Sequence, residues 1–335
     1  MMLETQVVVS PAPHIRDELS TEKAMKMVFI ALMPTTLFSF WNFGFKALFL
    51  VLVSIATCVF TEYIIEIALK KPVTVKDGSA ALTGLLLALT VSPGICPDLA
   101  KPSTWWMTMI IIVGGVVSIG LGKHIFGGLG HNPFNPALIG RAFLLASWPV
   151  PMTTWSWPKN ALDWAGANMD AVAGATVLNL DKMGTLQGLQ LKVPYLNLLW
   201  GNISGSLGET SALLLLVGGL YLIYKGVIDW RIPSAYFGTV IVLSFVFQKD
   251  PLFQLLAGGL FLGAFFMATD WVTSPVTKKG RIYFGIGCGI LTMLIRVFGG
   301  YPEGVCYAIL IMNAVTPLLD KLTLPIRFGE VKHHA

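Results

Sequence analysis

Apolar runs of about 20 residues recur along almost the whole chain, and they constrain its fold more than any other feature. A helix that rises about 1.5 Å per residue needs roughly 20 such residues to cross a hydrocarbon core of about 30 Å. Only 12% of the residues are charged, whereas soluble proteins use about 25%. The sequence therefore predicts an all-α integral membrane protein.

We expect about ten transmembrane helices in two five-helix repeats, with bounds uncertain by several residues. The expected spans are 24–41, 48–69, 79–91, 105–121, 136–148, 210–224, 232–247, 252–269, 282–298 and 305–319. The spans at 79–91 and 136–148 are short and are bounded by Pro, Gly and Asn. Such interrupted segments usually line a cavity or a cofactor site, so we expect broken helices there.

A faint internal repeat links the two halves. The third span of each half ends in Ser-Pro, at Ser92-Pro93 and at Ser274-Pro275. Because five crossings is an odd number, the second half is predicted to be inverted relative to the first. Chance likeness between apolar helices is the alternative.

The basic residues predict the orientation. With the N-terminus in the cytoplasm, sixteen of the 23 Lys and Arg residues, Lys123 and Arg141 among them, fall on the inner side. Both termini are then cytoplasmic. The expected order is a cytoplasmic segment at 1–23, a first repeat at 24–149, an extracytoplasmic loop at 150–208, a second repeat at 209–320 and a cytoplasmic tail at 321–335. The scattered basic residues indicate no nucleic-acid partner.

Cysteine and acid spacings carry less information. The four cysteines show no C-x-x-C spacing, so no zinc or iron–sulfur site is predicted. Glu62 and Glu66 lie one helical turn apart, and we expect a structural pairing with Lys70 on the same face.

The long loop contains one segment with residues suited to a chemical modification, Asp-Ala-Val-Ala-Gly-Ala-Thr at 170–176. Small residues around a hydroxyl allow a bulky group to approach the backbone. From the residues alone, a turn with an ordinary threonine is the simpler interpretation.

Several motifs together resemble the RnfD/NqrB family, whose members belong to the Rnf complex and to the sodium-pumping NADH:quinone oxidoreductase. The Asp-x-x-x-Gly-Ala-Thr segment resembles that family's flavinylation motif. The likeness spans nearly the whole chain, through Ser-Pro-Ala-Pro-His at 10–14, Lys-Asp-Gly-Ser-Ala at 76–80, Gly-His-Asn-Pro-Phe-Asn-Pro-Ala at 130–137, Met-Ala-Thr-Asp at 267–270 and Asn-Ala-Val-Thr-Pro-Leu-Leu-Asp at 313–320.

The resemblance implies a covalent flavin. Thr176 is the residue that a flavin transferase would esterify through the phosphate of FMN, and Gly174 and Ala175 complete the motif. Asp170 matches the acidic position, whereas Ala173 departs from the usual Ser or Thr. The resemblance also implies a non-covalent riboflavin near the broken helices. Asn132 and Asn135 are candidate contacts for it, with helix capping as the alternative.

The implied function is an electron relay coupled to movement of Na⁺ or H⁺ across a bacterial inner membrane. The chain has no nucleotide-binding fingerprint and no cluster-binding cysteines, so it would act only as one component of a complex. The implied partners are the other Rnf subunits, namely the membrane subunits RnfA and RnfE, the flavin subunit RnfG and the cytoplasmic subunits RnfB and RnfC.

Three acids are candidates for the ion path. Acidic side chains near lipid are costly unless they are paired or hydrated. Asp77, Asp270 and Asp320 meet this description, although each borders a predicted cytoplasmic end where it can meet water.

Two alternatives remain open within the sequence. The NqrB component of the sodium-pumping enzyme resembles this chain with a longer N-terminal extension, and about 23 residues precede the first span here, which favours the Rnf subunit. From another class, a flavin-free channel or transporter for a small solute would also suit an inverted repeat with broken helices.

Overall fold

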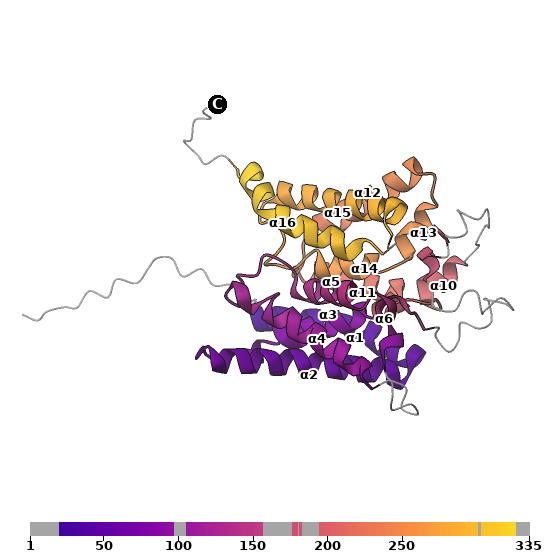
Figure 1. The fold of residues 1–335 in the computed structure, drawn as a ribbon. Coiled ribbons are helices and arrows are strands. Elements are labelled where there is room, and N and C mark those ends of the chain that lie inside the picture. The colour runs from indigo at the N-terminus through magenta and orange to yellow at the C-terminus, as the bar shows by residue number, and fades with distance from the viewer. Residues whose placement is uncertain are drawn as a thin grey trace, which may run out of the picture.

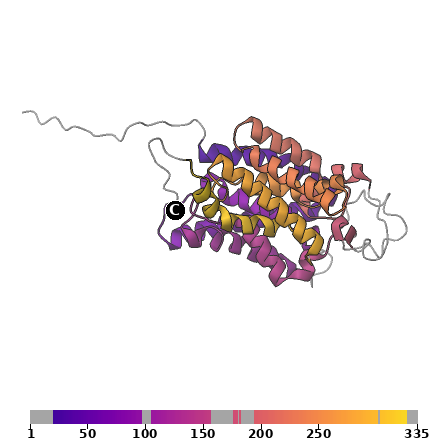
Figure 2. The same ribbon diagram turned by 90° about the horizontal axis from the view of Figure 1, so that it is seen from above.

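The computed structural model describes residues 20–96, 105–156, 176–179, 181–182, 194–300 and 303–325. Within these ranges the chain is helical and contains no strand. The helices run roughly along a common direction in both views, so the bundle has two distinct ends (Figure 1, Figure 2). Helices between residues 21 and 120 form one layer, and the helices at 231–246, 278–298 and 305–323 form the opposite layer (Figure 1).

The first half contains two long helices followed by shorter ones. Its helices are α1 (Thr21–Phe43), α2 (Phe45–Ala68), α3 (Ser79–Thr90), α4 (Met107–Gly120) and α5 (Pro136–Ser147). The connection to the second half includes α6 (Pro149–Thr153), α10 (Tyr195–Trp200) and the 3-10 turn η6 (Leu207–Thr210).

The second half places its long helices last. It comprises α11 (Ala212–Tyr224), α12 (Arg231–Val246), α13 (Pro251–Leu256), α14 (Leu260–Leu262), the π-helical turn η7 (Gly263–Met267), α15 (Lys278–Phe298) and α16 (Val305–Thr323). Among the described residues, five helices are long and apolar enough to cross a membrane, namely Thr21–Phe43, Phe45–Ala68, Met107–Phe126, Lys278–Phe298 and Val305–Thr323. The count of ten spans and the inverted pairing of the halves remain predictions.

The expected span at 252–269 is not one helix, because the chain breaks between α13 and α14. Ala257 is extended, and Gly258 follows with φ +72°, a left-handed conformation that favours glycine. The chain then continues into η7, where the N–H of Ala268 bonds to the carbonyl of Gly263 at 2.7 Å. The expected short helices at 79–91 and 136–148 are confirmed as α3 and α5.

Local capping explains where α3 begins. A carboxylate oxygen of Asp77 accepts hydrogen bonds from the backbone N–H of Ser79 at 2.7 Å and from its hydroxyl at 2.6 Å. Gly78, at φ +80°, makes the turn into the helix. The N-terminus of this short helix is therefore fixed by its own preceding residues.

A close helix crossing holds α3 against α2. The hydroxyl of Ser54 donates to the carbonyl of Gly84 at 2.7 Å. A Cβ added at Gly84 would lie 2.7 Å from the Cα of Ile55. Small residues at such crossings let helix backbones approach in membranes, where water does not drive association.

The described chain starts and ends at the same end of the bundle. Thr21, the first residue of α1, lines one cavity with Asp270, and Asp320 near the end of α16 accepts a hydrogen bond from the N–H of Val276 at 3.0 Å. Lys182 donates to the carbonyl of Gly299, which lies just beyond the opposite end of α15. The segment after Thr176 and the two ends of the described chain therefore occupy opposite ends of the bundle.

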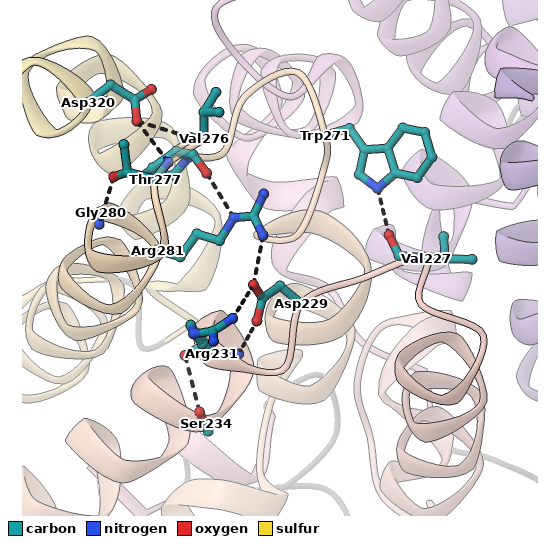
Figure 3. A network of polar contacts seen from close by, with 11 residues as sticks. Val227, Asp229, Arg231, Ser234, Trp271, Val276, Thr277, Gly280, Arg281 and Asp320 are labelled. Carbon is teal, nitrogen blue, oxygen red and sulfur yellow. Dashed lines mark hydrogen bonds and ion pairs between the residues drawn. The ribbon is translucent and has the colours of Figure 1, made fainter. Parts of the chain in front are cut away.

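A polar network fixes the connections at the end of the bundle where the described chain starts and ends (Figure 3). Asp229 accepts from the guanidinium groups of Arg231 and Arg281 at 2.8 and 2.7 Å, and the indole of Trp271 donates to the carbonyl of Val227 at 2.6 Å. Burial raises the pKa of Asp229, but hydrogen bonds from the Arg231 backbone and from both guanidinium groups outweigh it, so this pKa lies below its usual value.

Gly84→Ala is expected to destabilise the protein by about 1–3 kcal/mol, because overpacking must separate α2 from α3. A matched control is Gly238→Ala on α12, where an added Cβ meets nothing within 4 Å, so helix propensity should stabilise it by up to about 1 kcal/mol. Thermal unfolding in detergent measures both. Equal effects at the two positions would contradict the close crossing.

Asp229→Asn is expected to cost about 1–2 kcal/mol near neutral pH, since it removes charge-assisted hydrogen bonds. Because the folded carboxyl has a lowered pKa, its stabilising contribution is complete above its unfolded pKa and is lost as the pH falls through the folded pKa. The gap between the unfolding temperatures of the native protein and the variant should therefore close in acid. A gap that stays constant as the pH is lowered would refute this role.

Candidate functional site

A cavity of about 330 Å³ lies between the two halves. Its walls come from α1, α3, α11, η7 and the connections before α5 and after η7, so it is bounded by broken helices from both halves. Most of the lining is apolar. The polar or charged lining residues include Thr21, Ser79, Thr83, Lys123, Asn132, Asn135, Thr269 and Asp270.

The two asparagines predicted as flavin contacts both line this cavity. Asn132 is 3% exposed, and its amide nitrogen donates to the carbonyl of Phe134 at 3.1 Å. Its amide oxygen has no hydrogen-bond partner among the described residues. A buried acceptor without a donor is costly, so this oxygen is available to a ligand.

Asn135 has a structural role that the alternative interpretation foresaw. Its side-chain oxygen caps α5 by accepting from the N–H groups of Ala137 and Leu138 at 3.1 and 3.4 Å. Its amide nitrogen donates to the carbonyl of Met267 at 3.4 Å. One side chain thus starts a broken helix of the first half and contacts the π-helical turn of the second.

Of the three acids predicted for an ion path, the structure places Asp270 on the cavity wall. One of its oxygens accepts from the hydroxyl of Thr273 at 3.1 Å. Asp77 caps α3, and Asp320 accepts from the N–H groups of Val276 and Thr277 (Figure 3). Asp77 and Asp320 thus bind backbone N–H groups, and Asp270 is the one of the three acids that lines this cavity.

The expected pairing of Glu62 with Lys70 is wrong. Lys70 is exposed, whereas Glu62 is fully buried and binds the ammonium of Lys123 at 2.5 Å. Lys123, only 2% exposed, also donates to the hydroxyl of Ser79 at 2.6 Å. This lysine therefore lies in the protein interior beside the cavity, and not in a solvated loop that would report topology.

Arg141 was also predicted to mark the inner side, and the structure places it within α5. Its guanidinium donates to the carbonyl of Thr90 at 2.6 Å and binds Glu303 at 2.5 Å. Arg141 and Glu303 line a small cavity of about 20 Å³. The buried Glu209 lines this cavity as well. The sequence signal for this cluster was available, because Arg141 falls inside the expected span 136–148 and a charge there needs a partner.

Arg296 has a corresponding role in the second half, where it binds groups at a helix break. Its guanidinium donates to the side-chain oxygen of Gln254 at 3.1 Å and to the carbonyl of Ala257 at 3.0 Å. Ala257 lies at the break between α13 and α14. The arginine thus binds a carbonyl that the interrupted helix leaves free.

Thr176 lies at the opposite end of the bundle from the large cavity. Its side chain is 2% exposed, and its hydroxyl oxygen accepts from the N–H of Asn179 at 3.2 Å. Val177 and Leu178 pack with Ala257 and neighbouring apolar residues. The predicted motif residues Asp170, Ala173, Gly174 and Ala175 lie outside the described residues.

The segment after Thr176 reaches the buried ion pair. Asn179 lines a cavity of about 30 Å³ together with Arg141, Glu303, Trp155 and Tyr307. The charged cluster in the interior and the predicted attachment segment therefore share one wall.

Comparison with known proteins identifies the family. The description "NQR2, RnfD, RnfE family" applies to residues 8–329. The D subunit of the proton-translocating ferredoxin:NAD(+) oxidoreductase complex of Clostridium ljungdahlii is 46% identical, over 98% of this chain and 99% of the relative. The D subunit of the Na(+)-translocating complex of Acetobacterium woodii is 45% identical, over 99% and 98%.

A third relative is more distant. The D subunit of the ion-translocating oxidoreductase complex of Stutzerimonas stutzeri is 40% identical over 93% of each chain. The similarity spans both halves of the bundle and the connection between them. This chain belongs to the NQR2, RnfD, RnfE family.

Proposed function

We propose that this chain is the D subunit of an Rnf-type, ion-translocating ferredoxin:NAD⁺ oxidoreductase and that it relays electrons through bound flavin. The observation that best supports this proposal is the sequence identity of 45–46% with two relatives of that name, over at least 98% of each chain. A flavin-free channel that shared only the helix packing would not require this agreement along the whole length. The same names favour the Rnf subunit over the NqrB component of the sodium-pumping enzyme.

The first flavin in the proposal is FMN, esterified to Thr176 by a flavin transferase. Thr176 has the required hydroxyl and stands at the end of the bundle opposite the described chain ends. Because its side chain is buried, we expect the transferase to act before Val177 and Leu178 pack onto Ala257. That packing would then hold the attachment point against the helix break.

Asn179, three residues after that attachment point, lines one cavity with the Arg141–Glu303 pair. When bound, a flavin can exchange electrons one at a time, and its surroundings set its potential. A guanidinium that is already fixed by Thr90 and Glu303 would contribute a constant field there. This chain would hold the flavin and set its potential, and partner subunits would supply and accept the electrons.

The second flavin, a riboflavin, is proposed for the large cavity. Its volume of about 330 Å³ lies at the lower end of the usual range of small-molecule sites, roughly 300–1,000 Å³. The unpaired amide oxygen of Asn132 would accept a hydrogen bond from a ring N–H, and Lys123 and Asp270 provide charge on the same wall. The apolar residues of α1, α3 and η7 would contact the ring faces.

Ion coupling is proposed to involve Asp270, which lies on the wall of this cavity. The relatives from Clostridium ljungdahlii and Acetobacterium woodii carry different ions in their names, H⁺ and Na⁺, at nearly equal identity. The proposal is therefore for a monovalent cation.

The proposed setting is a complex in the bacterial inner membrane, with the Thr176 loop outside the cytoplasm. The proposed partners are the membrane subunits RnfA and RnfE, the flavin subunit RnfG and the cytoplasmic subunits RnfB and RnfC. The names of the relatives, each a lettered component of an oxidoreductase complex, support an assembly of several chains.

Thr176→Ala is expected to abolish covalent flavin, because no other atom of that side chain can form the phosphoester. The measurement is flavin fluorescence of the denatured subunit, purified from a host that makes the transferase. Thr176→Ser restores a hydroxyl and should retain part of the signal, and Thr154→Ala, at an exposed threonine, should retain all of it. Fluorescence that persists in Thr176→Ala would refute the attachment site.

Asp270→Asn is expected to lower cation uptake into vesicles at least about tenfold, since it removes a charge that is expensive to bury and is held at the cavity wall. Asp320→Asn is the matched control, because its amide oxygen can still accept from Val276 and Thr277. Electron transfer and complex assembly are measured beside uptake. Equal uptake by the Asp270 variant and the native complex would remove this residue from the path.

A further inference from the structure

A second cluster of ligand-forming side chains lies behind the wall of the large cavity. Glu62 and Glu66, one turn apart on α2, face His124 in the 3-10 turn η4 (His124–Phe126). One potential ligand atom from each of the three residues lies within 4.8 Å of the other two. The arrangement joins two oxygen ligands and one nitrogen ligand.

Three atoms of this cluster are buried without hydrogen-bond partners among the described residues. They are the second carboxylate oxygen of Glu62 and both ring nitrogens of His124. His124 is 9% exposed, and its Nε2 lies 3.9 Å from Oε1 of Glu62. Buried imidazoles normally donate or accept at least one hydrogen bond, so the unpaired Nε2 on the carboxylate side is available as a ligand atom.

The remaining contacts hold the carboxylates while leaving acceptor capacity. Lys123 binds Oε1 of Glu62 at 2.5 Å, which leaves Oε2 free. The N–H of Thr74 donates to Glu66 at 3.0 Å, and the Thr74 hydroxyl donates to its other oxygen. Each carboxylate oxygen has two lone pairs, so Glu66 can still bind a cation. Such outer partners orient the ligands of known metal sites.

The charge of this cluster and the types of its ligand atoms together determine which ion it can bind. The cluster has two carboxyl groups, those of Glu62 and Glu66, and the ammonium of Lys123 is bonded to Glu62. An imidazole beside carboxylates suits a first-row divalent ion, whereas Na⁺, Mg²⁺ and Ca²⁺ prefer oxygen ligands alone. We propose that Glu62, Glu66 and His124 form a binding site for a first-row divalent metal ion such as Zn²⁺.

The required geometry is within reach of side-chain rotation. Tetrahedral zinc, with bonds of about 2.0–2.2 Å, places its ligand atoms about 3.3 Å apart, so the present separations need to close by roughly 1.5 Å at most. Thr74 lies in an exposed stretch at 70–74, which provides a route to Glu66. The site is independent of the proposed redox function, although Lys123 connects it to the cavity.

The test measures zinc binding by the complex isolated from its own membranes and treated with a chelator. Equilibrium dialysis against Zn²⁺ alone, followed by elemental analysis, counts bound zinc, and subtracting the variant removes zinc held elsewhere. His124→Gln should lose one equivalent or weaken its affinity at least about tenfold. His131→Ala, an exposed histidine of the same connection, should bind as the native complex does.

A second variant separates metal binding from structural damage. His124→Cys removes the same imidazole but supplies a thiolate, so it should keep the site that His124→Gln loses. The proposal is overturned if the native complex has no saturable zinc equivalent beyond that of His124→Gln, or if His124→Cys loses zinc as fully as His124→Gln. Displacement of Zn²⁺ by equimolar Mg²⁺ or Na⁺ would also overturn it.

Discussion

Helices that stop inside a membrane must have their free carbonyl groups bound by protein, because lipid provides no donors. In the described part of this chain, three breaks have such a donor. The guanidinium of Arg141 binds the carbonyl of Thr90 at the end of α3, and Arg296 binds that of Ala257 after α13. Asn135 binds the carbonyl of Met267 at the end of η7. The rest of the structure depends on these contacts, because without them the breaks would be too costly to keep.

These donors also determine where the two cavity regions lie. Asn135 joins α5 to η7 and so forms one wall of the large cavity between the halves. Arg141 joins α5 to Glu303 and to the end of α3, and the small cavities beside it meet the segment that follows Thr176. The broken helices thus line polar sites in two separate regions of the bundle. A redox relay needs a fixed environment at each of its centres, and this arrangement could provide two.

Hydropathy, together with the Pro, Gly and Asn residues that bound the apolar runs, predicted the helical class, the two short helices α3 and α5 and the positions of most other helices. The sequence does not predict the break inside the expected span at 252–269, because the apolar run hides it and Gly258 marks it only through a positive φ. Lys123 and Arg141 were counted as topology charges because a sequence does not show what a basic residue faces. Their partners, Glu62 and Glu303, are 61 and 162 residues away, so local patterns could not pair them. Thr176 is proposed from its motif alone, whereas the pairing of cavity residues required the fold.

A high-resolution density map of the complex from its native membrane would test the central claim most directly, namely that this bundle holds flavin at both polar sites. We expect density continuous with the hydroxyl oxygen of Thr176, and a planar ring between the halves within hydrogen-bond reach of Asn132. An unmodified Thr176, together with a cavity filled by lipid or water, would contradict the account.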